Sequence, residues 1–242
     1  MNFVFDLDGT ICFKGQPLDE QVCHALDACI QQGHEVIFAS ARPIRDLLPI
    51  LPKEYHHFRM VGGNGAFTYA DHKIGVTYFP NEVQAQLVEI ALTHNLQYLA
   101  DSDWDYSYTG DEHHSIYQNI DPLKTASNKQ LHQLNGISKI VMFSPTDKVM
   151  NLLQLMNVSL FEHHTEVLID ISPSGMDKAK GLDQLGITEY IAFGNDANDR
   201  VLFEQAIYSV CVGHHPISMY ANETIAAANV ARKIKELSYQ YG

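Results

Sequence analysis

The sequence predicts an α/β fold, in which a Rossmann-like parallel-sheet core is interrupted by an inserted α+β domain. Short apolar runs alternate with helical patterns at both ends of the chain, which is typical of a parallel sheet covered by helices on both faces. From about residue 66 to residue 171 the pattern changes to short alternating segments, which favour antiparallel strands. We therefore expect a core of residues 1–78 plus 172–242 and an inserted domain of residues 79–171.

The first part of the core alternates strands with helices. Apolar side chains recur at helical spacing between residues 18 and 29, and Gly33 ends that helix. Pro43 stands where a second helix begins, at the first-turn position that proline tolerates. The expected elements are strands at 3–5, 35–40 and 60–61 and helices at 18–29 and 43–51.

From residue 66 onward the patterns are shorter and less regular, and the polar residues 109–136 predict no more than one helix. The expected elements of this region are a hairpin at 67–79, helices at 83–91 and 148–156, and strands at 98–100, 104–108, 137–143, 158–161 and 167–171. The core then resumes with helices from Lys178 and Asn198, strands at 190–193 and 208–212, and closing helices.

The composition argues against several classes of partner. The chain has 242 residues, of which 45% are hydrophobic and 19% charged, so it can bury a substantial core. Its net charge of −13 argues against nucleic acid or an anionic membrane as partner, and no apolar run approaches the ~20 residues of a membrane span. Met1 leads directly into the first strand, and the cysteines show no CxxC or zinc-ligand spacing. We therefore expect a cytoplasmic protein, a monomer or weak homodimer, that acts on a small molecule.

Two acids directly follow the first strand. Asp6 and Asp8 project toward the same side if the strand geometry persists, Gly9 lets the backbone turn, and Thr10 offers a hydroxyl just past the turn. Carboxylates this close repel each other unless a cation or a proton relieves them. Mg²⁺ is the natural cation, because it prefers carboxylate, carbonyl and phosphate oxygens. The alternative is a solvated turn that is merely rich in aspartate.

Other polar residues follow the later core strands or open the returning helix. They are Ser40, Arg42, Lys178 and the cluster 195–199, and together they could hold a phosphoryl group and a metal ion beyond the carboxyl ends of the strands. Each has a simpler explanation when taken alone: a turn for Ser40, the surface for Arg42 and Lys178, and a helix cap for the cluster. Lys180 competes with Lys178 for the same role. Their joint placement at successive strand ends favours a site.

Four motifs in this order resemble the haloacid dehalogenase (HAD) superfamily of phosphatases. They are DLDGT from Asp6, FASARP around Ser40, GMDK ending at Lys178, and GNDAND at residues 194–199, with Asn64-Gly65-Ala66 in addition. More narrowly, the chain resembles the Cof-type sugar-phosphatase subfamily, whose type IIB cap is inserted between the second and third motifs. The resemblance covers nearly the whole chain.

The resemblance implies a role for each motif. Asp6 would be the nucleophile that forms an aspartyl-phosphate, and Asp8 would be the general acid and base. Ser40 and Lys178 would bind phosphoryl oxygens, with Asn198 orienting Lys178. The implied Mg²⁺ ligands are Asp6, Asp8 (through its main-chain carbonyl), Asn195 and Asp199, and the implied substrate-binding residues are Gly9, Ala41, Arg42, Asn64, Gly65 and Asn198.

One position departs from the family pattern. The usual fourth motif is GDxxND, and its first acid is replaced here by Asn195. An amide oxygen can still bind Mg²⁺, but it contributes a dipole instead of a full charge. We therefore expect weaker metal affinity with activity retained, and the neighbouring Asp196 is the other candidate for the last ligand.

The motif set predicts a Mg²⁺-dependent phosphatase that hydrolyses small phosphorylated metabolites of the sugar-phosphate class, with the inserted domain as its cap. One alternative is a phosphomutase of the phosphomannomutase type. Its cap would need arginines for a second phosphate, and residues 66–170 contain none, which argues for hydrolysis. The other alternative is a non-catalytic phosphate-binding protein on the same scaffold, which Asn195 favours and the intact Asp6 and Asp8 oppose.

Overall fold

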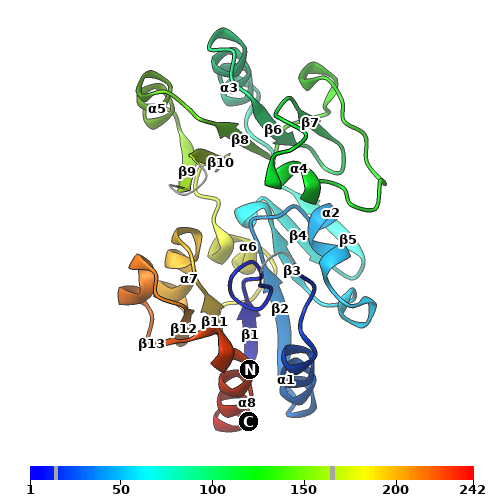
Figure 1. Ribbon diagram of the computed structural model, residues 1–242, viewed down its shortest axis with the longest axis vertical. Helices are drawn as coiled ribbons and strands as arrows, with labels where there is room; N and C mark the ends of the chain where they lie inside the picture. The colour runs from blue at the N-terminus through cyan, green and yellow to red at the C-terminus, as the bar shows by residue number, and fades with distance from the viewer. Residues whose placement is uncertain (14–15, 164–166) are drawn as a thin grey trace. The chain divides into compact units, whose positions relative to one another are not determined.

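The computed structural model describes residues 1–13, 16–163 and 167–242, and the chain divides into two units (Figure 1). We call Met1–Ile74 with Lys178–Gly242 the core unit, and Gly75–Asp177 the inserted unit. The first segment of the core unit ends at residue 74, whereas the sequence predicts its end at residue 78. The core resumes at residue 178, against 172 expected.

The core unit is built on a mostly parallel sheet in the strand order β13-β12-β11-β1-β2-β3-β4-β5. Its central strand β1 (Asn2–Phe5) pairs in parallel with β2 (Glu35–Ala39) and with β11 (Tyr190–Gly194). The remaining strands are β3 (Met60–Gly62), β4 (Phe67–Ala70), β5 (Lys73–Val76), β12 (Tyr208–Val212) and β13 (Glu223–Ile225), of which β4 runs antiparallel to β3. The carboxyl ends of β1, β2, β3 and β11 therefore lie along one edge of the sheet.

The helices of the core unit are α1 (Glu20–Gln31), α2 (Ile44–Leu47), α6 (Lys178–Gln184), α7 (Arg200–Gln205) and α8 (Val230–Gln240). Asp19 caps α1 by accepting from the main-chain N–H of Gln21, 2.7 Å away. Gly33 has φ +83° just past the end of this helix, a conformation that favours glycine.

Two parts of the core unit differ from expectation. The second helix is short: it begins after Pro43, whose ψ of 160° lies outside the helix, and it gives way to a 3₁₀ turn at Leu48–Ile50. The closing region was expected to be helical throughout, yet Glu223–Ile225 form the edge strand β13. Only Ile225 of this strand is buried, so it carries almost no hydrophobic pattern.

The inserted unit is an antiparallel sheet in the order β7-β6-β8-β10-β9, with helices beside it. Its strands are β6 (Tyr98–Asp101), β7 (Tyr106–Tyr108), β8 (Lys139–Phe143), β9 (Val158–His163) and β10 (Leu168–Pro173). Its helices are α3 (Asn81–Thr93), α4 (Ser115–Asn119) and α5 (Asp147–Gln154). The helix expected within residues 109–136 is thus limited to α4 and a 3₁₀ turn at Leu131–Gln133.

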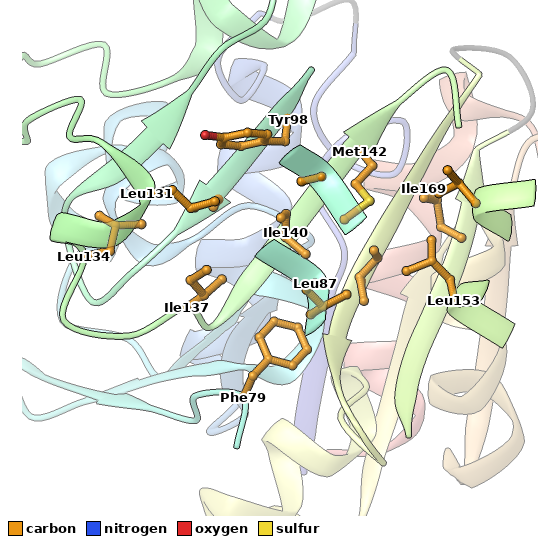
Figure 2. Packing of buried hydrophobic residues seen from close by; sticks show 14 residues of the cluster. Phe79, Leu87, Tyr98, Leu131, Leu134, Ile137, Ile140, Met142, Leu153 and Ile169 are labelled. Carbon is orange, nitrogen blue, oxygen red and sulfur yellow. The ribbon is translucent and has the colours of Figure 1, made fainter. Parts of the chain in front are cut away.

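The inserted unit has an apolar core of its own. Figure 2 shows Leu87 of α3, Leu153 of α5, and Ile140 and Met142 of β8 in one buried cluster. A second cluster, which includes Leu99 and Val141, packs with Ile116 and Tyr117 from α4. Within the described residues, no helix combines the length and apolar character that crossing a membrane requires.

Candidate active site

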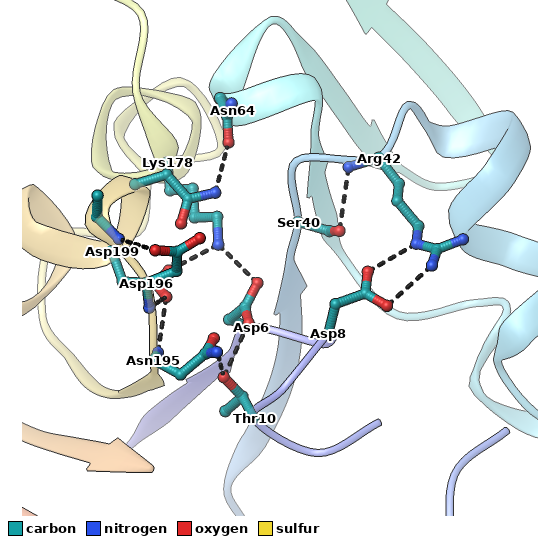
Figure 3. A network of polar contacts seen from close by, with 12 residues as sticks. Asp6, Asp8, Thr10, Ser40, Arg42, Asn64, Lys178, Asn195, Asp196 and Asp199 are labelled. Carbon is teal, nitrogen blue, oxygen red and sulfur yellow. Dashed lines mark hydrogen bonds and ion pairs between the residues drawn. The ribbon is translucent and has the colours of Figure 1, made fainter. Parts of the chain in front are cut away.

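Polar side chains from separate parts of the core unit meet at the carboxyl edge of its sheet (Figure 3). Asp6 directly follows β1, Ser40 follows β2, and Asn195 follows β11. The parallel register places Phe5 beside Phe38 and Phe193, so the residues that follow emerge next to one another. The sheet therefore brings three of the sequence motifs together.

Lys178, the first residue of α6, is fully buried at this edge. Its Nζ lies 2.6 Å from Asp6 Oδ1 and 2.6 Å from Asp199 Oδ1, so one ammonium group joins two carboxylates. The competing Lys180 forms an ion pair with Asp183 at the surface, where 51% of the lysine side chain is exposed. Lys178 is therefore the lysine that faces the candidate site.

Close backbone packing explains how a helix delivers this lysine. A Cβ atom on Gly181 would lie 2.4 Å from Val61 Cγ1 and 3.0 Å from the Cα of Gly65. Glycine at this position thus lets α6 approach β3 and the 3₁₀ turn Gly63–Gly65. That approach places the start of α6 at the strand ends.

Asp199 fixes both the lysine and the turn after β11. Its Oδ1 accepts from Lys178, and its Oδ2 accepts from the main-chain N–H groups of Asn195 (2.8 Å) and Asp196 (3.1 Å). The carboxylate occupies space that a side chain at Gly194 would need, since a Cβ there would lie 2.6 Å from Asp199 Cγ. Both oxygens of this predicted metal ligand are therefore occupied within the protein.

The Asp6 carboxylate is held on both of its oxygens. Lys178 donates to Oδ1, and the buried Thr10 hydroxyl donates to Oδ2 over 2.8 Å. Burial raises the pKa of Asp6 to about 7, although Lys178 opposes this shift. Burial alone would lower the pKa of Lys178, but Asp199 and Asp6 together raise it, so the lysine stays protonated.

Thr10 was not among the residues assigned from the sequence. The available signal was its place just past the Gly9 turn, and its contact with Asp6 depends on how that turn folds back. The Leu7 carbonyl accepts from the main-chain N–H of Thr10, Ile11 and Cys12, which closes the turn.

Asp8 has a different environment from Asp6. Arg42 donates from Nε to Asp8 Oδ2 (2.7 Å) and from Nη2 to Asp8 Oδ1 (2.8 Å), a bidentate ion pair. The Asp8 side chain is nevertheless 47% exposed. The two acids therefore have different partners, although the main-chain N–H of Asp6 still donates to the Phe193 carbonyl and the chain turns only from Leu7 onward.

Ser40 is buried beside this ion pair. Its Oγ accepts from the main-chain N–H of Arg42 over 3.1 Å, across the intervening Ala41. The Arg42 carbonyl in turn accepts from Gly63 N–H (2.8 Å), which links the turn after β2 to the turn after β3. Ser40 and Arg42 are thereby placed in one rigid segment.

The remaining predicted substrate-binding residues mostly shape the site. Asn64 is buried in the left-handed region (φ 53°), and its Oδ1 accepts from Asn198 Nδ2 over 3.0 Å. Asn198 therefore holds the Asn64–Gly65 turn, and the predicted support of Lys178 comes from Asp199 instead. The Gly9 N–H donates to the Cys12 carbonyl over 2.8 Å, so the contribution of this residue is its missing side chain and its φ of +83°.

Asn195, and not Asp196, faces Asp6. Asp196 accepts from Ala197 N–H (2.7 Å) and caps the 3₁₀ turn Ala197–Asp199. The side-chain amide of Asn195 lies 3.0 Å from Thr10 Oγ1, and with its nitrogen turned inward it is 3.1 Å from both Asp6 Oδ2 and the Asp8 carbonyl oxygen.

A carboxylate oxygen of Asp6, the carbonyl oxygen of Asp8 and the amide oxygen of Asn195 are of the type that a hard divalent cation prefers. These residues therefore fit Mg²⁺ by the chemistry of their oxygen atoms. Over residues 1–13, 16–163 and 167–242, no group of three or more His, Cys, Asp or Glu side chains is arranged to hold a metal ion. A cation at this edge would therefore depend on the Asp6 carboxylate, the Asp8 carbonyl and the Asn195 amide oxygen.

Comparisons with known proteins show which family and fold the chain shares. A family model described as haloacid dehalogenase-like hydrolase matches residues 3–230. The 5-amino-6-(5-phospho-D-ribitylamino)uracil phosphatase YitU of Bacillus subtilis is 26% identical over 96% of this chain and 95% of its own length.

Two solved structures share the fold over nearly the whole chain. The HAD subclass IIB sugar phosphatase BT4131 superposes with a TM-score of 0.78 at 16% identity, covering 98% of both chains. A haloacid dehalogenase-like hydrolase from Bacteroides thetaiotaomicron superposes with a TM-score of 0.79 at 20% identity, also over 98% of both chains. The predicted fold class and the predicted family are confirmed.

Proposed function

Because the chain belongs to the haloacid dehalogenase-like hydrolases, we propose that it is a Mg²⁺-dependent phosphatase of small phosphorylated metabolites that works through an aspartyl-phosphate on Asp6. The substrates would be of the sugar-phosphate class. We place the enzyme in the cytoplasm as a monomer or weak homodimer. Its net charge of −13 argues against nucleic acid or an anionic membrane as a partner.

One observation carries the proposal: a fully buried lysine lies 2.6 Å from the carboxylate that follows the central strand. Burying an ammonium group is unfavourable unless charges pair with it, so such a lysine is retained where a site needs positive charge. A phosphoryl group approaching Asp6 would meet Lys178, which offsets the repulsion between the carboxylate and the incoming anion.

In the first step, an Asp6 oxygen would attack phosphorus while the bond from phosphorus to the leaving oxygen breaks. Asp8 would give its proton to that leaving oxygen. In the second step, Asp8 would take a proton from water, the water oxygen would attack phosphorus, and the bond to Asp6 would break to release phosphate. Ser40 and Lys178 would bind the nonbridging phosphoryl oxygens throughout.

Asp8 must be free of at least one Arg42 contact to exchange protons, and its 47% exposure is compatible with that movement. Asp6, the Asp8 carbonyl and Asn195 would hold Mg²⁺, which when bound neutralises charge on the phosphoryl oxygens. Asp199 would act as a positioning residue for Lys178, because both of its oxygens are engaged.

We assign the inserted unit the role of a cap that selects the leaving group and excludes water. It forms a separate compact unit with its own apolar clusters. This supports a domain whose residues can change substrate selection without changing the residues that carry out phosphoryl transfer. The absence of arginine from residues 66–170 supports water over a second sugar hydroxyl as the phosphoryl acceptor.

The test is a phosphate-release screen over sugar phosphates, polyol phosphates and an aryl phosphate, with and without Mg²⁺. The phosphoribityl compound named for the Bacillus subtilis relative belongs in the panel. Asp6→Asn should abolish turnover, whereas the surface control Asp183→Asn should keep it. Phosphate release by Asp6→Asn at the parent rate would overturn the assignment, as would binding of phosphate without turnover on any substrate.

A further inference from the structure

The hydrogen-bond network determines which way the Asn195 amide is turned. The Thr10 hydroxyl has a single proton and lies 2.8 Å from Asp6 Oδ2, which can only accept when Asp6 is ionised, the form that a cation would bind. Thr10 therefore donates to Asp6 and has only its lone pairs left for Asn195. The Asn195 amide must then present its NH₂ group to Thr10.

In that orientation the amide nitrogen lies among three oxygens. Thr10 Oγ1 is 3.0 Å away, and Asp6 Oδ2 and the Asp8 carbonyl oxygen are each 3.1 Å away. The Asp6 and Asp8 oxygens are also the two fixed donors that the proposed Mg²⁺ would need. The NH₂ group has two hydrogens, so it can donate to two of these three oxygens at a time.

The surroundings leave little freedom for this amide except to turn over. Asn195 is only 9% exposed, and a Cβ on Gly9 would lie 2.3 Å from the amide atom that points away from Thr10. An amide is flat, with nitrogen and oxygen of nearly equal size, so a half-turn about its last bond exchanges a donor for an acceptor in the same space.

We infer that the Asn195 amide takes two orientations in the cation site. Without metal its NH₂ group donates to the oxygens of Thr10, Asp6 and Asp8 that surround it, two at a time, and its oxygen takes the place of the NH₂ group when a divalent cation binds. The inference rests on the proposed Mg²⁺ site. Two consequences follow: the metal-free site is stable, and the cation must displace hydrogen bonds that already exist.

The charge balance distinguishes asparagine from the aspartate of the family pattern. Asp6 and Asp199 share one buried lysine, so the buried cluster already carries one excess negative charge when Asp6 is ionised. A third carboxylate at position 195 would add like-charge repulsion to the metal-free protein and attraction for a cation. Compared with aspartate at position 195, asparagine should therefore bind the cation more weakly but make the metal-free protein more stable.

The experiment compares the full-length parent with Asn195→Asp, using Mn²⁺ binding followed by electron paramagnetic resonance and thermal unfolding in chelator or in Mg²⁺. We expect Asn195→Asp to bind Mn²⁺ at least about tenfold more tightly, to unfold at a lower temperature in chelator, and to gain more from Mg²⁺ than the parent does. Asp196→Asn is the matched control and should leave Mn²⁺ affinity unchanged. Equal Mn²⁺ affinity and equal stability of Asn195→Asp and the parent in chelator would overturn the inference.

Asn195→Ala provides a second, independent measurement if the aspartate variant does not fold. It removes the donor and the acceptor together, so both stability in chelator and Mn²⁺ affinity should fall; parent-like values for either would also overturn the inference. None of these readouts depends on turnover. Failure of the phosphatase proposal would instead appear as normal Mn²⁺ binding with no phosphate release.

Discussion

Two carboxylates only two residues apart lie in opposite environments. Asp6 is buried and joined to Lys178, Thr10 and, through the lysine, to Asp199; we call these four residues the Lys178 network. Asp8 is half exposed and forms a bidentate ion pair with Arg42, and we call this pair with Ser40 the Arg42 network.

The difference shows how one strand end can separate two chemical duties. A nucleophile has to be held in place and desolvated, and each carboxylate oxygen of the Lys178 network accepts a hydrogen bond. A group that exchanges protons has to move and to meet water, and the single arginine beside Asp8 permits that. The separation comes from the partners at the strand end, because Lys178 and Thr10 contact Asp6 whereas Arg42 contacts Asp8.

The largest expected effect comes from breaking the Lys178 network. Lys178→Met should lower kcat/KM about 10³-fold, since a buried positive charge next to the phosphoryl position is lost. It should also lower the melting temperature, because Asp6 and Asp199 would remain buried without their shared cation. Lys180→Met is the matched control, and steady-state kinetics showing equal activity for the two variants would contradict the role given to Lys178.

Removing the acid of the Arg42 network should have an effect that depends on the substrate. Asp8→Asn should slow hydrolysis of alkyl and sugar phosphates about 10²–10⁴-fold, because their leaving oxygens need a proton. Aryl phosphates with acidic phenols leave as anions, so their first step should be slowed much less. Single-turnover rates measured for both classes of substrate test this. An equal loss of rate on both classes would show that Asp8 is not the proton donor.

Releasing Asp8 from its arginine should have a smaller effect. Arg42→Met should reduce kcat/KM about tenfold, which corresponds to the loss of one charge-assisted hydrogen bond. The loss should appear as a higher KM if Arg42 binds the substrate. It should appear as a lower kcat if Arg42 only positions Asp8. Arg42→Lys keeps the charge but not the paired geometry, so its activity should fall between the two. An unchanged kcat and KM in Arg42→Met would leave the Arg42 network without a function.

The smallest effect is expected at an ion pair on the edge strand β13, away from the candidate site. This ion pair serves as a control for the two networks. Lys233 lies 3.0 Å from Glu223, and hydrogen bonds from Lys233 and Tyr208 lower the pKa of Glu223 despite its partial burial. The folded pKa is below the unfolded one, so this stabilisation is present above the ordinary glutamate pKa and is lost as the pH falls through the lowered value.

Glu223→Gln should therefore reduce stability at neutral pH by less than about 1 kcal/mol, since the carboxylate stays 32% exposed. The difference from the parent should vanish in acid. Melting temperatures measured from neutral pH down to about pH 3 check this, and a difference that grows toward low pH would reverse the assigned sign.

The parts of the fold that could be predicted are those with repeated local patterns. The strands that flank β1 are almost wholly apolar, and α1 carries its cap, its apolar face and its terminating glycine in the sequence. β13 could not be predicted, because two of its three residues are not buried and pairing with β12 alone defines it.

The candidate site was predictable in its membership but less so in its contacts. Residues at strand ends could be listed from the motifs, whereas the partners of Asp199, Asn198 and Arg42 depend on turns that meet only in three dimensions. The expectation that Asn198 supports the lysine failed for this reason: adjacent residues of one tight turn point in different directions.

The missing side chain of Gly9 leaves room for the side chain of Asn195, so the residues tolerated at these two positions depend on each other. Any side chain at position 9 would collide with the amide at 195, which lies 186 positions later in sequence (195 against 9). A lineage that changes one of these residues must therefore accommodate the other, and substitutions at the two positions should be inherited together.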